Sequence, residues 1–311
     1  MEFQKDIPLS KYSNYKIGGA ARYFYVPKTA EEVLKGIEKA KKEGLPIFVL
    51  GGATNLLISD KGFSGLVIKP DIKVLEESGG KIRVGAGVNV ADLLQFVIQH
   101  SLAGLEWAGG LPGTVGGAIR GNAGAFGGEI KDVVEEVTSL DLSGNAPKIV
   151  KHDFKASKFG YRSSIFKEKG GAEIILEATL ALKKGDQQAI RDAIQTKINY
   201  RLERHPMDLP NIGSIFKNVD WKDVPKEVQE RFIDKVKKDP FPVLPTAILL
   251  SEAGLKGVRE GGAMFSPKHP NFIVNVESAS AADVKKLIAL AKETIKQKFG
   301  VILEEEVQWV E

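Results

Sequence analysis

GGLPGTVGGAIRGNAGAFGG, residues 109–128, is the stretch that most constrains the fold of this 311-residue chain. Nine of its twenty positions are glycine. Each glycine costs roughly 0.5–1 kcal/mol in a regular helix or strand, so we expect neither of those structures here. Dense glycine lets backbone N–H groups approach a ligand, and successive N–H groups form an anion-binding concavity. The stretch therefore indicates a loop that binds a diphosphate, with a set of tight surface turns as the alternative.

A second glycine loop, GGATNL (51–56), follows directly on the expected buried strand 46–50. The helix before that strand is predicted by the capping box Thr29-Ala-Glu-Glu32 and by Gly44 as its C-cap. A third loop, Gly85-Ala-Gly87-Val-Asn-Val90, has valine where a dinucleotide fingerprint requires Gly or Ala. We therefore assign the phosphate-binding function to the first two loops.

The pattern of the chain outside these loops predicts an α+β protein in three parts, residues 1–70, 71–204 and 205–311. A hairpin is expected around Gly79-Gly80, and a helix over 186–204 that ends before His205-Pro206. The last part is expected to contain a strand at 213–218, a helix at 226–239, a strand pair (262–265 and 271–276) and a helix capped by Ser280-x-x-Asp283. A final alternating strand is expected over 301–310.

The composition excludes several classes of function. The chain has no cysteine, which excludes thiolate metal sites and thiol chemistry and is typical of a reducing cytoplasm. Its net charge of +4 is dispersed, so we expect no nucleic-acid partner. The polar start and the lack of a long apolar run predict neither a signal peptide nor a membrane span. The four histidines are scattered without ligand spacing, so no metal is expected.

Several ordered motifs resemble the UDP-N-acetylenolpyruvoylglucosamine reductase family: GGATNLLISDKGFSGLVIK, AGGLPGTVGGAIRGNAGAFGGEI, FGYRSSIF, NIGSIFKN and LEEEV. The resemblance begins at Asn14-Tyr-Lys-Ile-Gly-Gly19 and covers essentially the whole chain. It implies a two-domain FAD-binding module of the vanillyl-alcohol-oxidase type plus a smaller α+β substrate domain. It also implies NADPH as reductant and a UDP-sugar as substrate, in peptidoglycan synthesis.

By this resemblance the two glycine loops enclose a non-covalent FAD. The implied cofactor-binding residues are Gly51, Gly52, Ala53, Thr54, Asn55, Leu56, Gly110, Pro112, Gly113, Thr114, Gly116, Gly117, Asn122, Ala123 and Gly124. The implied substrate-binding residues are Tyr161, Arg204, Lys217 and Asn218.

The implied reaction reduces an enol ether conjugated to a carboxylate, so it needs a partner for the carboxylate and an acid for the α-carbon. The family motifs assign these roles to Arg162, a bidentate cation, and Ser214, a proton donor beside Gly213. Glu306 would hydrogen-bond the substrate. The expected strand places Glu304, Glu306 and Gln308 on one face, which suits either a polar cleft or a solvated surface.

The chain departs from the family pattern at a few positions. Ala53 stands where glycine is usual, Arg120-Gly121 precede Asn122 where methionine is frequent, and Phe126 replaces a tyrosine. Gln308 replaces an arginine that could contact the nucleotide diphosphate. We expect a monomer. The alternatives are a related FAD oxidase or dehydrogenase of hydroxy acids or alcohols, and a nucleotide-sugar-binding protein without enzymatic activity.

Overall fold

The computed structural model describes residues 2–144, 146–238 and 241–311. The chain forms two compact units. Unit 1 contains the segment up to Ile7, Ala21–Gly52 and Phe63–Tyr200; unit 2 contains Pro8–Ala20, Ala53–Gly62 and Arg201–Glu311. Segments 8–20 and 53–62, expected in the first part of the chain, thus belong with the C-terminal unit. The finer three-part division stays a prediction.

The first sheet of unit 1 has the order β1-β2-β5-β3. Its strands are β1 (Gln4–Pro8), β2 (Ala20–Tyr25), β5 (Phe63–Ile68) and β3 (Ile47–Val49), with β2 and β3 parallel to β5. Helix α1 (Ala30–Lys42) lies between β2 and β3 in sequence. The hydroxyl of Thr29 accepts a 3.2 Å hydrogen bond from the Glu32 N–H, so the predicted N-cap of α1 is confirmed.

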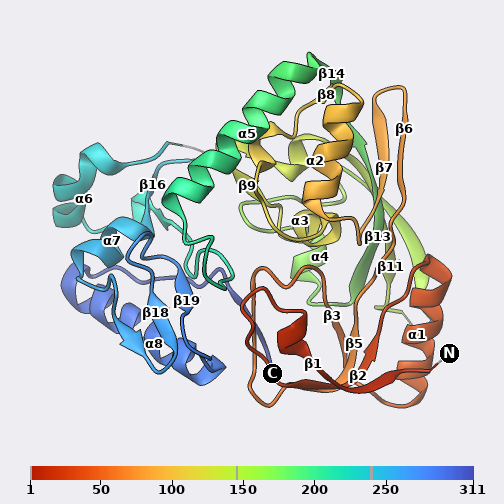
Figure 1. Cartoon of the computed structure of the whole chain (residues 1–311), viewed down its shortest axis with the longest axis horizontal. Helices are drawn as coiled ribbons and strands as arrows, with labels where there is room; N and C mark the ends of the chain where they lie inside the picture. Colours follow the sequence, from red (N-terminus) through yellow and green to blue (C-terminus); the bar gives the residue numbers. More distant parts are fainter. Residues whose placement is uncertain (1, 145, 239–240) are drawn as a thin grey trace. The chain divides into compact units, whose positions relative to one another are not determined.

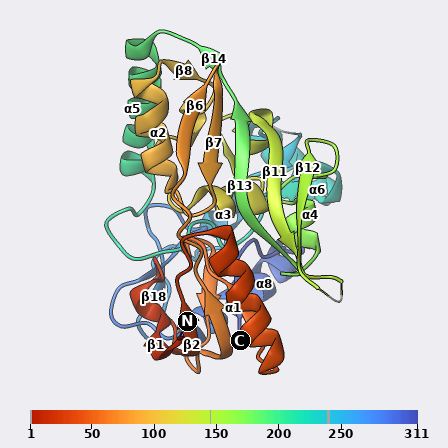
Figure 2. The ribbon, with the colours of Figure 1, turned by 90° about the vertical axis from the view of Figure 1, so that its right-hand side faces the viewer.

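The second sheet of unit 1 is antiparallel, with the order β12-β11-β13-β7-β6. Its strands are β12 (Lys148–Asp153), β11 (Val134–Asp141), β13 (Glu173–Ala181), β7 (Lys81–Gly85) and β6 (Leu75–Ser78). The hairpin predicted at Gly79-Gly80 joins β6 and β7. Helices α2 (Val90–Gln99) and α5 (Gln187–Arg204) lie side by side (Figures 1 and 2). Ile37 of α1 packs in one buried cluster with Leu66 of the first sheet and Leu140 of the second, so α1 joins the two sheets.

The glycine-rich stretch 109–128 contains regular structure, and our expectation that it would contain none is wrong. Helix α3 (Val115–Arg120) begins after Thr114, and β9 (Gly124–Ala125) pairs with β10 (Gly128–Glu129). A Cβ on Gly116 would lie 2.8 Å from the Cβ of Ala86, so glycine lets α3 approach the segment after β7. Phe126 and Gly127 both have positive φ, as in a type I′ hairpin turn.

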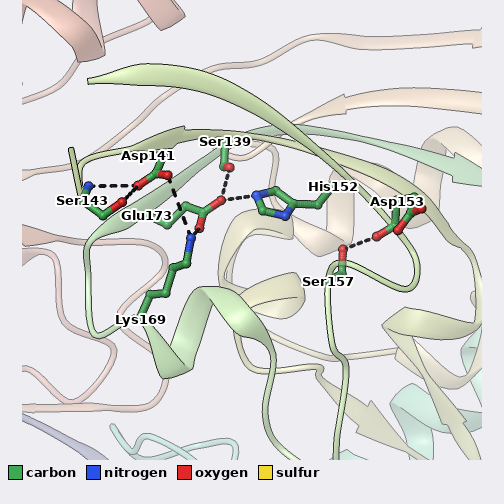
Figure 3. A network of polar contacts seen from close by, with 8 residues as sticks. All are labelled: Ser139, Asp141, Ser143, His152, Asp153, Ser157, Lys169 and Glu173. Carbon is green, nitrogen blue, oxygen red and sulfur yellow. Dashed lines mark hydrogen bonds and ion pairs between the residues drawn. The ribbon is translucent and has the colours of Figure 1, made fainter. Parts of the chain in front are cut away.

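A buried polar network ties β11, β12 and β13 to the chain after α4 (Ile165–Glu168), as Figure 3 shows. Glu173 accepts hydrogen bonds from Ser139, at 2.5 Å, and from His152, and forms an ion pair with Lys169. Burial alone would raise the pKa of Glu173, but its bonds to Lys169 and Ser139, together with the nearby His152, outweigh that effect and lower it. The carboxylate is therefore charged and paired inside the sheet.

Short elements complete unit 1. They are β8 (Leu102–Ala103), which pairs with β14 (Lys183–Lys184), and the 3-10 helices η2 (Glu106–Ala108) and η3 (Ile130–Asp132).

Unit 2 packs its helices and short strands around one buried apolar cluster. Helix α8 (Ala281–Phe299) begins at the predicted capping box, in which Ser280 and Asp283 bond reciprocally, and ends at Gly300 in the left-handed conformation. It lies against β18 (Ala263–Phe265), which pairs antiparallel with β17 (Arg259–Glu260) and β19 (Ile273–Asn275) (Figure 1). The predicted strand pair is confirmed.

The remaining elements of unit 2 are short. They are η1 (Leu9–Lys11), β4 (Leu56–Ile58), β15 (Val219–Asp220), η4 (Trp221–Asp223), α6 (Lys226–Phe232), η5 (Ile233–Lys235), β16 (Val243–Leu244), α7 (Thr246–Glu252) and β20 (Gln308–Val310). Strand β15 pairs with β16, and β20 runs parallel to β4.

Three expectations for unit 2 need correction. The strand expected at 213–218 forms only isolated bridges, at Ser214 and Phe216, because its partners are loop residues. The helix expected over 226–239 ends at Phe232 and continues as η5; Asp239 lies outside the described residues. The final strand is regular only over 308–310. Val310, which an alternating strand would place on the same face as Gln308, is buried and pairs with Ile58.

Candidate functional site

The two glycine loops approach each other closely within unit 1. A Cβ on Gly52 would lie 2.5 Å from the Cα of Gly113, and a Cβ on Gly51 would lie 3.1 Å from the hydroxyl oxygen of Thr114. No real Cβ tolerates the first of these distances, so glycine at position 52 is required for the contact. The residues predicted to hold the cofactor diphosphate are thus brought together at this point.

The backbone of the 51–54 loop presents a row of available donors. Among the residues that the structure describes, none accepts a hydrogen bond from the N–H of Gly51, Gly52, Ala53 or Thr54. The N–H groups of Gly110, Gly113 and Thr114 have no internal acceptor in the same part of the chain. Backbone amide donors of this kind have the chemistry to bind a diphosphate without a lysine.

The first turn of α3 is different, because its N–H groups already have acceptors. The N–H groups of Gly116 and Gly117 donate to the Ala86 carbonyl, at 3.0 Å, and to the Thr114 hydroxyl, at 3.4 Å. Gly116 and Gly117 therefore serve close packing and capping of α3 in this structure. The neighbouring Pro112 has no N–H and follows Leu111 into the turn.

Arg162 lies in a tight turn of unit 1. The N–H of Gly160 donates to the Ser163 carbonyl at 3.0 Å, and Arg162 has a φ of 54°, a position that usually favours glycine. Its guanidinium donates a 2.8 Å hydrogen bond to the Gly124 carbonyl and lies 5.3 Å from the ring centre of Tyr161. Strained backbone positions of this kind cluster at functional sites, so the geometry agrees with a functional arginine.

Asn122 stabilises the Arg162 turn through a hydrogen bond to its backbone. It is fully buried and has a φ of 41°. Its amide nitrogen donates to the Gly160 carbonyl at 2.8 Å and to Glu129 at 3.0 Å, and its amide oxygen accepts from the Lys131 N–H. The side chain predicted to contact the cofactor is therefore used within the protein. Ala123 and Gly124 follow it into β9, where the Gly124 carbonyl holds Arg162.

Ser214 and Glu306 are brought together in unit 2, although 92 positions separate them in sequence. The Glu306 N–H donates to the Ile215 carbonyl at 2.8 Å, and Phe216 bridges Glu305. Gly213 has a φ of 81°, and no atom lies within 4 Å of where its Cβ would be. Ser214 thus lies between Gly213, whose Cβ position is open, and Ile215, which bonds the Glu306 segment.

Asn55 links the second half of the 51–56 loop to the same segment. Its amide nitrogen donates to the Glu306 carbonyl at 3.0 Å, and its own carbonyl accepts from the Gln308 N–H at 3.1 Å. Leu56 then pairs with Gln308 at the start of β4. The predicted cofactor loop and the predicted catalytic Glu306 are therefore neighbours within unit 2.

The remaining predicted substrate residues have mixed surroundings. Lys217 forms an ion pair with Glu304, and its N–H donates to the Glu304 carbonyl at 2.9 Å. The amide oxygen of Asn218 accepts from the Thr246 N–H at 3.3 Å. Arg204 is exposed at the end of α5.

The sequence did not predict the residues that brace the Arg162 turn, Glu129 and Lys167, because their role appears only when the chain folds back on itself.

Within the described ranges, no group of three or more His, Asp or Glu side chains could hold a metal ion. No helix in the part of the chain that the structure describes is both long and apolar enough to span a membrane.

The glycine loops, their free amide donors and the α+β fold define an FAD-dependent oxidoreductase, and residues 21–148 match the family model of an FAD binding domain. Residues 205–310 match the C-terminal domain of UDP-N-acetylenolpyruvoylglucosamine reductase. The chain belongs to the UDP-N-acetylenolpyruvoylglucosamine reductase family. The predicted family, α+β fold class and flavin cofactor are confirmed.

Individual relatives support this assignment over the full chain. The reductase of Caldicellulosiruptor bescii is 37% identical and aligns with 100% of this chain and 91% of its own length. That of Lachnoclostridium phytofermentans is 36% identical over 97% and 91%. The crystal structure of the Thermus caldophilus enzyme has a TM-score of 0.78 at 28% identity and covers both chains fully.

Proposed function

We propose that this protein reduces UDP-N-acetylenolpyruvoylglucosamine to UDP-N-acetylmuramate with NADPH, for peptidoglycan synthesis in the cytoplasm. The observation that carries the proposal is the pairing of the Ser214 segment with the Glu306 segment beside the open space at Gly213. A related oxidase or a binding protein has no need of that pair. As a soluble monomeric enzyme it would contribute to cell-wall growth, cell shape and division.

The FAD is held by backbone donors of the 51–54 and 110–114 loops, which fit its diphosphate. When bound, FAD would supply the transfer of hydride from NADPH to the β-carbon of the enolpyruvyl double bond. No cysteine occurs in the chain and no histidine lies in either loop, so the flavin is non-covalent. Acid precipitation should release all the yellow colour into the supernatant; colour kept in the pellet would contradict non-covalent binding.

Residues of the chain stabilise the negative charge that forms on the substrate and supply the proton to its α-carbon. Addition of a hydride at the β-carbon leaves negative charge on the α-carbon and its carboxylate. Arg162 binds that carboxylate as a planar, permanently charged partner, and Glu306, in its protonated form, donates a hydrogen bond to the same group. Ser214 gives its hydroxyl proton to the α-carbon and then recovers a proton from water. Tyr161, Arg204, Lys217 and Asn218 bind the substrate and its diphosphate.

Mixing the purified protein with NADPH, and then with the enolpyruvyl substrate, tests this function. We expect NADPH to bleach the flavin and the substrate to restore the colour while UDP-N-acetylmuramate forms, as identified by mass. An oxidase or dehydrogenase of hydroxy acids would bleach with such an acid and recover with oxygen or another acceptor. A binding protein would show neither change. Repeating the bleaching with NADH measures the preference between the two reductants.

A further inference from the structure

The Ser214 segment lacks the support that a regular strand would give. Ser214 and Phe216 form isolated bridges to Phe272 and Glu305, and no continuous ladder runs through them. A proton donor must nevertheless be held within a fraction of an ångström of its acceptor, because a 1 Å misplacement costs about 10²-fold in rate. Something other than a sheet must therefore fix this segment.

Asn271, just before β19, takes the place of a neighbouring strand. Its amide oxygen accepts from the Phe216 N–H at 3.0 Å, and its amide nitrogen donates to the Phe216 carbonyl at 2.8 Å. Its main-chain carbonyl also accepts from the Ile215 N–H at 2.8 Å. The residue is only 3% exposed, so water cannot replace these bonds. One side chain thus satisfies both backbone polar groups of Phe216.

The opposite edge of the same segment carries Glu306. The Ile215 carbonyl accepts from the Glu306 N–H at 2.8 Å, and the Lys217 N–H donates to the Glu304 carbonyl at 2.9 Å. Asn271 therefore holds one edge of a short extended segment whose other edge holds Glu306. If Asn271 lost its hydrogen bonds to Phe216, Ser214 and Glu306 would shift together.

We infer that Asn271 is a positioning residue for the Ser214–Glu306 pair. It acts by fixing the backbone next to Ser214, through its bonds to Ile215 and Phe216. This inference rests on the proposed function, in which Ser214 donates the proton.

The chain offers a matched control in Asn275, four positions further along. Its amide nitrogen donates to the Tyr15 carbonyl at 3.1 Å and its amide oxygen accepts from the Ala279 N–H at 2.9 Å. It is 8% exposed, so it resembles Asn271 in burial and in bonding. Its side chain bonds Tyr15 and Ala279 and makes no bond to Phe216, so Asn275→Asp should disturb the fold without moving Ser214.

The test compares Asn271→Asp with Asn275→Asp in the FAD-loaded enzyme. An aspartate at 271 keeps the acceptor for the Phe216 N–H but sets a carboxylate against the Phe216 carbonyl. We expect bleaching by NADPH near the wild-type rate in both variants. Recovery of colour with the enolpyruvyl substrate should slow about 10–10²-fold in Asn271→Asp only. Amide hydrogen exchange at Phe216 should speed up in the same variant.

A pH profile separates positioning from a general loss of stability. Protonation of the aspartate restores a donor to the Phe216 carbonyl, so the recovery rate of Asn271→Asp relative to wild type should rise as the pH falls. If Asn271→Asp does not fold, Asn271→Gln carries the test, with a partial slowing of recovery alone. Equal slowing of both half-reactions in Asn271→Asp, or the same slowing of recovery in Asn275→Asp, would overturn the inference. Failure of the wild-type enzyme to recover its colour would overturn the proposed function instead.

Discussion

The backbone N–H of Glu306 donates a 2.8 Å hydrogen bond to the carbonyl of Ile215, the residue that follows Ser214. The C-terminal segment thus lies against the segment that carries the proposed proton donor. Asn55 adds a second tie, because its side chain bonds the carbonyl of Glu306 at 3.0 Å. One short stretch near the C-terminus is therefore fixed by the cofactor loop and by the Ser214 segment at once.

Tyr15→Phe should stabilise the protein. The Tyr15 side chain is fully buried in the core of unit 2, and its hydroxyl has no hydrogen-bond partner among the described residues. A buried hydroxyl without a partner costs about 1–3 kcal/mol. We expect the urea midpoint to rise by the equivalent of about 1 kcal/mol, against no change for the half-buried Tyr23→Phe. A loss of stability of that size would mean that a buried water serves the hydroxyl.

Lys169→Met should destabilise the protein by about 2–4 kcal/mol, because it leaves the fully buried carboxylate of Glu173 without its cation (Figure 3). Lys151→Met is the matched control. Lys151 pairs with Glu136 on the same sheet, but both side chains are exposed, so its loss should cost less than about 1 kcal/mol. Equal urea midpoints for the two variants would contradict a buried, charged Glu173.

Much of the secondary structure could be predicted because local signals coincide with tertiary contacts. Thr29 caps α1 and Ser280 caps α8, where cap and helix are adjacent in sequence. The prediction failed where a partner is distant. Glycines 116 and 117 are poor helix formers, yet α3 forms because Gly116 must pack against Ala86. The assignment of 53–62 to the C-terminal unit depends on the parallel pairing of β20 with β4, and that of 8–20 on contacts such as the Asn275 side chain with the Tyr15 carbonyl. No local pattern reveals either contact.

The stability of unit 2 should fall as the pH decreases from 6.5 to about 4. Burial lowers the pKa of both His205 and His269 from 6.5 to about 4, and each lies near other cations. These are His269, Arg201, Lys268 and Lys237 for His205, and Lys237 and Lys256 for His269. The rings are 5.2 Å apart, so protonation of one also disfavours protonation of the other.

The sign follows from proton uptake. Below pH 6.5 the unfolded chain binds protons at both histidines and the folded chain does not, so acid favours unfolding until about pH 4. We expect a loss on the order of 1–3 kcal/mol across the window, measured as free energy of unfolding in urea. The double variant His205→Asn, His269→Asn should show a flatter curve. An unchanged slope in that variant would exclude the pair as the cause.

Gln308→Arg should tighten nucleotide-sugar binding. Gln308 replaces an arginine usual in the family, and its backbone is fixed by pairing with Leu56, so the substitution should leave the strand in place. A well-placed charged partner for a diphosphate is worth about 1.5–3 kcal/mol, or roughly 10–100-fold in KM, with kcat unchanged. Gln308→Glu should raise KM. If KM stays constant in both variants, another residue such as Arg204 binds the diphosphate.

The sequence predicts which residues carry the chemistry of the candidate site, but it does not predict which residues hold them in position. Motifs singled out Arg162, Ser214 and Glu306, since these carry the chemistry. The residues that hold them are Asn122 and Asn271. Their side chains form hydrogen bonds with the backbone of Gly160, in the Arg162 turn, and of Phe216. Asparagine in a loop is typical of any turn, so its partner can be known only once the chain is folded.

Ser214→Ala should separate the two halves of the catalytic cycle. NADPH reduces the flavin without delivering a proton to carbon, so FAD content and the bleaching rate should stay close to wild type. Reduction of the enolpyruvyl group needs a proton at the α-carbon, and recovery of colour with substrate should slow about 10²–10⁴-fold. Ser214→Cys should regain part of the rate, because a thiol is the stronger acid.

Glu306→Gln should affect the same half-reaction, because Glu306 lies on the segment that bonds the residue after Ser214. Glutamine keeps the backbone bond to Ile215 and can still donate a hydrogen bond, but it cannot carry a proton. Its effect should therefore fall on colour recovery alone, as for Ser214→Ala. If Ser214→Ala slows bleaching and recovery equally, Ser214 shapes the cleft and donates no proton. If recovery stays fast in Ser214→Ala but collapses in Glu306→Gln, Glu306 is the acid and the assignment of the proton to Ser214 is wrong.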